Sequence, residues 1–345
     1  MSHNQFLLMR LSHLGDIILT TGVIDYWHRN YGWTFHFITS QSMLPILQDH
    51  PAVASVISVS QEDRSLTAWL QFCQALRRKY AHLPFIDLHG TLRSRILGAL
   101  WPNSVMHYPK KGLCRRFFQR THKDYFQKKL IQANVPQRYS LALEKTAPPK
   151  ELLRPNIPVS ARDRAWAQKQ LALTQPFALV ALHPYATHQA KEWPREKWLA
   201  LMERLHAQGI ACMVIGQSKM PLLTTENTSC KNTQKEQILD FTNTTNIAQT
   251  CALLEQADVL VSGDSGPMHM GTAVNTPVVA LFGQTCEEWG FYPSGPQDTV
   301  ITLSLPCSPC SLHGNHACTK NFACMRDISV DQVLKTILAR IPATQ

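Results

Sequence analysis

One acidic residue follows the first apolar segment of the chain, in the sequence Arg10-Leu11-Ser12-His13-Leu14-Gly15-Asp16. Residues 6–11 are apolar enough for a buried strand, Gly15 permits a tight turn, and a helix is expected from Asp16 onward. A carboxylate at a strand end that faces a cleft can act as a general base. The alternative is a helix cap, because Asp is a preferred N-cap residue and suits the positive end of a helix dipole.

A second polar group lies between an expected strand at residues 177–182 and an expected helix at residues 195–208. Thr187 and Lys191 are four residues apart there, so a hydroxyl and an ammonium group could hold one phosphate across the loop. Trp193-Pro194 would anchor the loop and start the helix. The alternative is an ordinary surface loop with an exposed lysine.

The third group is Gly263-Asp264-Ser265-Gly266-Pro267-Met268-His269, where an expected strand gives way to an expected helix. Asp264 or Ser265 caps that helix, and Gly266 lets a ligand approach the backbone. The free N–H groups of the first turn then form an anion site suited to a diphosphate, with His269 in reach. The alternative is a capped helix without a ligand. Trypsin-like proteases share the Gly-Asp-Ser-Gly-Pro pattern, but they are secreted all-β proteins, and this context is α/β.

The three groups together fit the transfer of a sugar from a nucleotide diphosphate. Asp16 would take a proton from an acceptor hydroxyl as that hydroxyl attacks the anomeric carbon. Lys191 and the helix N-terminus would stabilise the departing diphosphate. Fixed positive groups can replace a divalent metal in such a site, and the chain contains no Asp-x-Asp triplet. We therefore expect neither a metal nor another cofactor.

These groups need secondary structure that places them at strand ends. The first half alternates expected strands and helices, and the second half repeats the pattern. The expected strands are residues 6–11, 34–38, 53–59, 84–88, 177–182, 210–215, 259–261 and 277–282; the expected helices include 67–79, 93–100, 195–208, 247–256, 267–274 and 330–341. This alternation predicts two α/β halves with parallel sheets, a proline-bearing linker at residues 146–158, and a substrate cleft between the halves.

Composition limits the classes of protein that the chain can belong to. Its 345 residues exceed one typical core, and 44% hydrophobic with 17% charged residues is typical of soluble globular proteins. There is no apolar run of about 18 residues and no secretory signal, so we expect a cytoplasmic protein without a transmembrane segment. The net charge of +10 suggests a polyanionic partner such as nucleic acid, an anionic membrane or a phosphorylated substrate.

Four of the ten cysteines form a C-x2-C-x7-C-x5-C pattern near the end of the chain, with two histidines inside it. The members are Cys307, Cys310, Cys318 and Cys324, with His313 and His316. In a cytosolic chain this pattern is typical of a structural metal site or of reduced thiols. The spacing is not that of a standard zinc ribbon or finger, so both interpretations stay open.

The three polar groups resemble the signatures of glycosyltransferase family 9, the lipopolysaccharide heptosyltransferases. Family members carry R-L-S-x-L-G-D, then H-P-x-A…K-x-W-P, then D-[ST]-G-x-M-H followed by G-T-P-V-V-A-L-F-G, which corresponds to residues 275–283 here. The match covers most of the chain in the same order. Residues 216–219 depart from the family pattern, because an acidic residue often stands there and faces the ribose.

The resemblance implies a GT-B fold, in which two Rossmann-like domains face each other across a cleft. Residues 1–155 would bind the acceptor, residues 156–325 would bind the nucleotide sugar, and residues 326–345 would form a helix that crosses back to the first domain. It implies inverting, metal-independent transfer of L-glycero-D-manno-heptose from ADP-heptose, with Asp16 as the base. The residues implied at the substrates are Gly15, Thr187, Lys191, Asp264, Ser265, Gly266 and His269.

The implied acceptor is lipid A–Kdo, in the inner core of lipopolysaccharide at the inner face of the cytoplasmic membrane. Residues 110–129 carry eight basic residues and one acid, interleaved with aromatics, and could meet its phosphates and carboxylates. Arg93 and Arg95 could join them. The cysteine pattern favours the branch that adds the second heptose. The alternatives are another nucleotide sugar or glycan acceptor, a related sugar epimerase, a nucleic-acid-binding protein that uses the basic residues, or a solvated basic surface.

Overall fold

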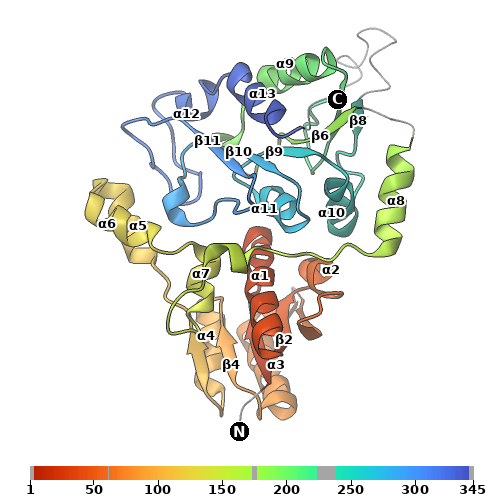
Figure 1. Ribbon diagram of the computed structural model, residues 1–345. Helices are drawn as coiled ribbons and strands as arrows, with labels where there is room; N and C mark the ends of the chain where they lie inside the picture. Colours follow the sequence, from red (N-terminus) through yellow and green to blue (C-terminus); the bar gives the residue numbers. More distant parts are fainter. Residues whose placement is uncertain (1–3, 61, 173–176, 224–237, 342–345) are drawn as a thin grey trace. The chain divides into compact units, whose positions relative to one another are not determined.

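The computed structural model describes residues 4–60, 62–172, 177–223 and 238–341, which form two compact units (Figure 1). The first unit is Met1–Gly112 with Ala133–Pro158, and the second is Leu113–Gln132 with Val159–Gln345. The chain therefore passes between the units three times. Each unit is built around its own parallel sheet.

The first unit has a five-stranded sheet in the order β3-β2-β1-β4-β5, and all its strand pairs are parallel. The chain builds outward from β1 on one side, then returns to add β4 and β5 on the other, so the strand order reverses between β1 and β4. The strands are β1 (Gln5–Met9), β2 (Thr34–Ser40), β3 (Val53–Val59), β4 (Phe85–Asp87) and β5 (Val105–His107). The helices are α1 (Leu14–Tyr31), α2 (Leu44–Leu47), α3 (Leu66–Tyr80), α4 (Leu92–Leu100) and α7 (Val135–Ser140).

The second unit repeats this arrangement with six parallel strands in the order β11-β10-β9-β6-β7-β8. Here the strand order reverses between β6 and β9. The strands are β6 (Ala178–His183), β7 (Ile210–Val214), β8 (Ile238–Asp240), β9 (Val259–Gly263), β10 (Val278–Phe282) and β11 (Thr299–Thr302). The helices are α5 (Gly112–Thr121), α6 (Asp124–Ile131), α8 (Ala161–Leu171), α9 (Arg195–His206), α10 (Ile247–Glu255), α11 (Gly266–Ala273), α12 (Ala323–Arg326) and α13 (Val330–Leu338).

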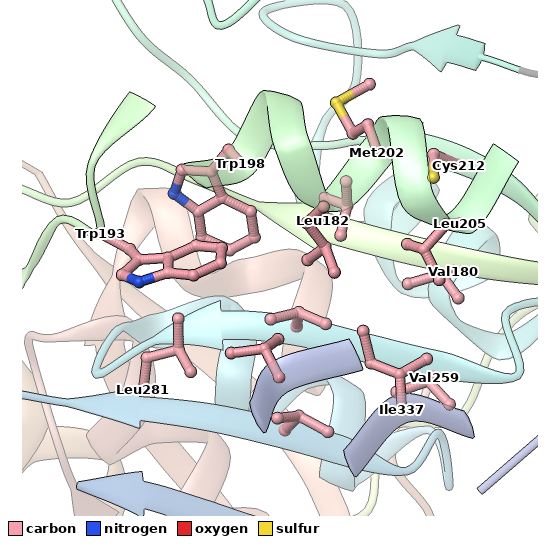
Figure 2. Close-up of a cluster of buried hydrophobic side chains, with 14 of the residues drawn as sticks. Val180, Leu182, Trp193, Trp198, Met202, Leu205, Cys212, Val259, Leu281 and Ile337 are labelled. Carbon is pink, nitrogen blue, oxygen red and sulfur yellow. The ribbon is translucent and has the colours of Figure 1, made fainter. Parts of the chain in front are cut away.

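The core of the second unit lies between one face of its sheet and helices α9 and α13 (Figure 2). Strand residues Val180 and Leu182 meet Trp198 and Leu205 of α9, and all four side chains are almost completely buried. The strands read as continuous apolar runs because both faces of a parallel sheet are covered. This packing fixes the strand ends from which the polar residues emerge.

The expectation that residues 326–345 form a helix that crosses back to the first half stays a prediction, and the structure describes this segment as far as Ile341. Helix α13 packs on α9 and β10 within the second unit. Val333 and Ile337 point into the core of that unit and are fully buried there. The apolar face of the helix is therefore covered by the unit to which the preceding chain already belongs.

Residues 113–132 also differ from the expected division at residue 155, because they belong to the second unit. Phe118 and Leu130, on α5 and α6, pack on Trp289 in a small buried cluster. The contact partner is more than 150 residues further along the chain, so no local pattern could have indicated it.

The proline-bearing stretch at residues 146–158 is packed against the first unit rather than forming an extended linker. The 3-10 helix η3 (Lys150–Leu153) contacts α1, and Leu153 is fully buried. Gly22 of α1 makes this contact possible. A Cβ at that position would overlap the Leu153 carbonyl oxygen and lie 2.6 Å from the carbonyl carbon of Arg154.

Within the described residues, no helix has the length and apolar character required to cross a bilayer.

Replacing Gly22 with Ala should lower the free energy of unfolding of the first unit by about 1–3 kcal/mol, because the new methyl group would overlap backbone atoms that cannot rotate away. Gly112→Ala is the matched control, since a Cβ there meets no atom within 4 Å. Calorimetry of thermal unfolding compares the melting temperatures of the two variants with that of the wild type. A Gly22→Ala protein that melts together with the wild type would contradict the close packing of α1 on η3.

Candidate functional site

In the first unit, the carboxylate of Asp16 lies in the first turn of α1, just beyond the end of β1. Its Oδ1 accepts a hydrogen bond of 2.7 Å from the Tyr139 hydroxyl, and its Oδ2 forms an ion pair with Arg10. Arg10 also donates to the Leu88 carbonyl oxygen beyond β4, at 2.7 Å. The side chain of Asp16 is only 10% exposed. Asp16 is therefore held at the point where the strand order of the first sheet reverses.

Asp16 does not cap α1, so the capping alternative is wrong. The helix begins at Leu14, and the N-cap residue is His13 in the left-handed region at φ 68°. Asp16 stands two residues inside the helix and directs its carboxylate to Arg10 and Tyr139 instead. The positive φ of His13 is uncommon for a residue other than glycine and is typical of constrained sites.

Tyr139 and Arg10, the two partners of Asp16, both stay protonated and can donate hydrogen bonds to its carboxylate. Burial raises the pKa of the Tyr139 phenol well above its ordinary value, so the phenol stays protonated and donates. Burial opposes the charge of Arg10, but the Asp16 carboxylate favours it, and the net shift of the guanidinium pKa is upward. A carboxylate offers roughly four acceptor positions, so two donors leave room for a further hydroxyl.

The end of β4 lies beside this group and carries a second buried carboxylate, Asp87. Its Oδ1 accepts from the backbone N–H groups of His89 and Gly90 at 2.9 and 2.8 Å, and its Oδ2 accepts from Ser94 at 2.8 Å. Burial, with a smaller effect of the neighbouring Arg10, lowers the pKa of His89 to about 4. His89 is therefore neutral at neutral pH. The Asp87 carboxylate stabilises the turn after β4 through its hydrogen bonds to the backbone and to Ser94.

In the second unit, Lys191 and Asp264 form a largely buried ion pair. The Lys191 Nζ lies 2.7 Å from Asp264 Oδ2 and 3.1 Å from the Asp264 carbonyl oxygen, and the side chains are 17% and 14% exposed. The Thr285 hydroxyl donates to the same Oδ2 at 2.7 Å. These residues follow β6, β9 and β10, which are adjacent in the sheet, so their carboxyl ends bring the side chains together.

The segment that carries the cysteine pattern packs along the stem of Lys191. A Cβ on Gly314, at φ 77°, would lie 2.7 Å from the Lys191 Cγ. Gln284 fixes the segment through both ends of its amide, which donates to the His316 carbonyl oxygen at 2.8 Å and accepts from the His316 N–H at 3.1 Å. The cysteine segment therefore restricts the position of the lysine.

The four cysteines of this pattern are free thiols in the structure. Burial and the nearby thiols of Cys310, Cys318 and Cys307 raise the pKa of Cys324 to about 11, which favours the protonated form. Within residues 4–60, 62–172, 177–223 and 238–341, no three His, Cys, Asp or Glu side chains are arranged to hold a metal ion.

A buried imidazole orients the residue before α11. The Nδ1 of His183 lies 3.3 Å from both the Ser262 and Ser265 hydroxyls, and the two hydroxyls are 3.1 Å apart. Burial lowers the pKa of His183 to about 4, so the ring is neutral at neutral pH. Gly216 leaves space for this ring, because a Cβ there would lie 2.7 Å from the His183 Cδ2.

Ser265 occupies the N-cap position of α11, but its side chain makes no capping hydrogen bond. The Asp264 side chain is engaged by Lys191 and Thr285. Neither of the two expected caps therefore satisfies the first N–H groups of this eight-residue helix. A helix N-terminus with open N–H groups favours an anion.

The structure brings some of the predicted site residues together and leaves others apart. Lys191 and Asp264 are in contact, and Ser265 and Gly266 follow directly at the start of α11. His269 is buried in the same helix, whereas Thr187 is exposed in the loop after β6. Gly15 and Asp16 lie in the first unit.

Several residues that complete these groups carried no predicted role. Arg10, His183 and Thr285 all lie at or just beyond strand ends, and that position was the available signal. Tyr139 had no such signal, because it is 123 residues from Asp16 in the chain.

Two Rossmann-like units in one chain are typical of the GT-B fold. Each unit here carries polar groups where its strand order reverses, so this protein belongs to the GT-B class. The sequence model of glycosyltransferase family 9 (heptosyltransferase) matches residues 69–319. The chain belongs to this family.

Two curated relatives show how far the similarity extends. A lipooligosaccharide heptosyltransferase 2 of Haemophilus influenzae is 30% identical over 178 residues, which are 48% of this chain and 51% of that protein. A lipopolysaccharide heptosyltransferase 1 of Campylobacter coli is 24% identical over 291 residues, covering 81% of this chain and 83% of that protein. The first similarity thus spans about half the length of each protein, and the second spans most of it.

Solved structures show the same fold. The ADP-heptose lipopolysaccharide heptosyltransferase II of Escherichia coli superposes with a TM-score of 0.75 at 20% identity, covering 98% of each chain. A family 9 glycosyltransferase from Veillonella parvula gives a TM-score of 0.73 at 18% identity, covering 98% of this chain and 97% of that one.

We expect the neutral state of His183 to make stability depend on pH. The folded ring stays neutral down to about pH 4, whereas the unfolded ring takes a proton near pH 6.5. The unfolded state therefore binds more protons in this window, so the free energy of unfolding falls as the pH drops from about 6.5 to 4 and this contribution levels off below.

His183→Gln should reduce that fall by on the order of 3 kcal/mol. Urea unfolding at a series of pH values measures the slope, and exposed His82 supplies the control variant His82→Gln. If His183→Gln kept the pH dependence of the wild type, the buried neutral imidazole would be ruled out.

Proposed function

We propose that this protein is an inverting heptosyltransferase that moves L-glycero-D-manno-heptose from ADP-heptose to the inner core of lipopolysaccharide. The observation that carries the proposal is the position of the polar groups in both units. Asp16 lies where the first sheet reverses its strand order, and Lys191, Asp264 and Ser265 lie where the second one does. Ligands of α/β proteins bind at such reversal points.

The second unit supplies features that suit a nucleotide diphosphate. The first N–H groups of α11 are free of a side-chain cap and can donate hydrogen bonds to phosphate oxygens. Lys191 uses two of its three N–H donors on Asp264, which leaves one for the ligand. Asp264 neutralises the lysine before a ligand arrives, so the helix N-terminus supplies the remaining attraction for the diphosphate.

The first unit supplies the base. An acceptor hydroxyl bound to Asp16 gives its proton to the carboxylate while its oxygen forms a bond with the anomeric carbon. The bond between that carbon and the diphosphate oxygen breaks on the opposite side, and its electron pair leaves with ADP. A single displacement of this kind inverts the anomeric configuration, and Lys191 with α11 stabilises the departing charge without a metal.

The names of the relatives support the choice of the acceptor and of the heptose that is added. Relatives called heptosyltransferase 1, 2 and 3 act, by those names, on lipopolysaccharide or lipooligosaccharide. We propose lipid A–Kdo at the inner face of the cytoplasmic membrane as the acceptor of a cytoplasmic enzyme. The segment of 30% identity with the Haemophilus influenzae heptosyltransferase 2 supports addition of the second heptose, to lipid A–Kdo that already carries the first.

The nucleotide is tested first, by calorimetric titration with ADP, UDP and GDP in the absence of metal. We expect selective binding of ADP, and Lys191→Met should weaken it by about tenfold or more, because a charge-assisted contact is lost. Lys169→Met, on exposed α8, is the control. A preference for UDP or GDP would move the assignment to another nucleotide sugar, which the departure at residues 216–219 leaves open.

Asp16→Asn should slow heptose transfer by about 10²–10⁴-fold while leaving ADP affinity unchanged, because the amide cannot take the proton. Asp25→Asn is a closely matched control, since Asp25 is another buried aspartate of α1 that pairs with an arginine, Arg29, at 2.9 Å. Transfer is measured as release of ADP in the presence of lipid A–Kdo that carries the first heptose. Equal losses in the two variants would make Asp16 a structural residue.

A further inference from the structure

Helices α5 and α6 form a hairpin, drawn in yellow in Figure 1, whose inner face is firmly attached to the second unit. Phe118 and Leu130 are buried against Trp289. The Gln119 amide donates to the Cys310 carbonyl oxygen at 2.9 Å, and Gln127 donates to Glu288 at 2.7 Å. We call the face of the hairpin that faces away from these contacts its outer face.

The outer face of the hairpin exposes large apolar side chains. Leu113, Phe117, Tyr125 and Ile131 are between 51% and 69% exposed. Phe117 stacks on Phe126 with ring centroids 5.4 Å apart. A gathering of exposed apolar side chains within one short hairpin is typical of a docking surface, whereas single exposed ones are ordinary.

Cations surround these apolar side chains, and the hairpin contains one acidic residue, Asp124. Lys129 places its ammonium group 4.4 Å from the centre of the Tyr125 ring. Long basic side chains can lay their stems on apolar surface and keep their charges in the headgroup layer. The exposed cations are Arg116, Arg120, Lys123, Lys128 and Lys129.

We propose that the outer face of α5–α6 docks on the surface of an anionic lipid bilayer. Aromatic and aliphatic groups that project between cations are the features that hold amphipathic helices at such an interface. Phosphate backbones of nucleic acids would engage the cations, but they would leave Leu113 and Ile131 in water. A lipid surface satisfies both sets of side chains.

This inference deepens the proposed function, because it names the segment that would bring the enzyme to its membrane-borne acceptor. Since α5–α6 belongs to the second unit, the bilayer would hold the unit that carries Lys191 and α11. Lipid binding itself requires neither donor nor acceptor, so it is measured independently of transfer.

The test is flotation of the full-length protein with vesicles of phosphatidylcholine alone or mixed with phosphatidylglycerol. We expect binding to the mixed vesicles only, and weaker binding as salt is raised. Arg116→Gln/Arg120→Gln/Lys128→Gln should weaken binding by on the order of 100-fold. Leu113→Ser/Phe117→Ser should weaken it by about tenfold or more, since two apolar side chains no longer enter the interface.

Matched controls lie elsewhere on the second unit. Arg162→Gln/Lys169→Gln/Lys335→Gln removes three exposed cations, and Phe177→Ser/Met220→Ser removes two exposed apolar side chains. Both should bind vesicles like the wild type. ADP titration of every variant checks that the nucleotide site is intact.

Equal losses in hairpin and control variants, or no preference for anionic vesicles, would overturn the proposal. Binding of duplex DNA without binding of vesicles would overturn it as well and would favour the nucleic-acid alternative. If vesicles bind as expected but ADP does not, the lipid surface stands and the proposed transfer fails.

Discussion

Parallel pairing is the constraint on which both polar groups depend. All strands of a parallel sheet deliver their carboxyl ends to the same edge, and a reversal of strand order sends the helices that follow two neighbouring strands to opposite faces. The loops after β1 and β4, and after β6 and β9, therefore diverge and leave their polar groups open to a ligand. Asp16, Asp87, Lys191 and Asp264 all stand at these loops, although they come from segments with no sequence similarity.

Charge pairing is the second feature that the two groups share. Asp16 is neutralised by Arg10, and Lys191 by Asp264, and each pair is largely buried. An isolated charge at that depth would cost several kcal/mol of desolvation, so each unit can fold with its paired charges already in place. The start of α11 differs from these pairs, because its N-cap residue Ser265 makes no side-chain capping hydrogen bond.

Local patterns were sufficient for most of the fold, and they indicated at which strand ends polar side chains gather. Apolar runs bounded by turn residues predicted β3 and most of the other strands within a few residues, and strand-end position indicated Asp16, Lys191 and Asp264. Tyr139 and the attachment of α5–α6 could not be predicted, because each depends on a contact between segments more than 100 residues apart. The same holds for α13, whose amphipathic pattern specifies that a face is buried but not which surface buries it.

The threading of the chain limits how this protein can be divided. Residues 113–132 leave the first unit, pack with Trp289 and its neighbours, and return before η3. A fragment that stops at Pro158 would carry this hairpin with its apolar inner face uncovered. Chimaeras that exchange one of the two units between family members would therefore need to transfer the hairpin with the second unit, using three junctions instead of one.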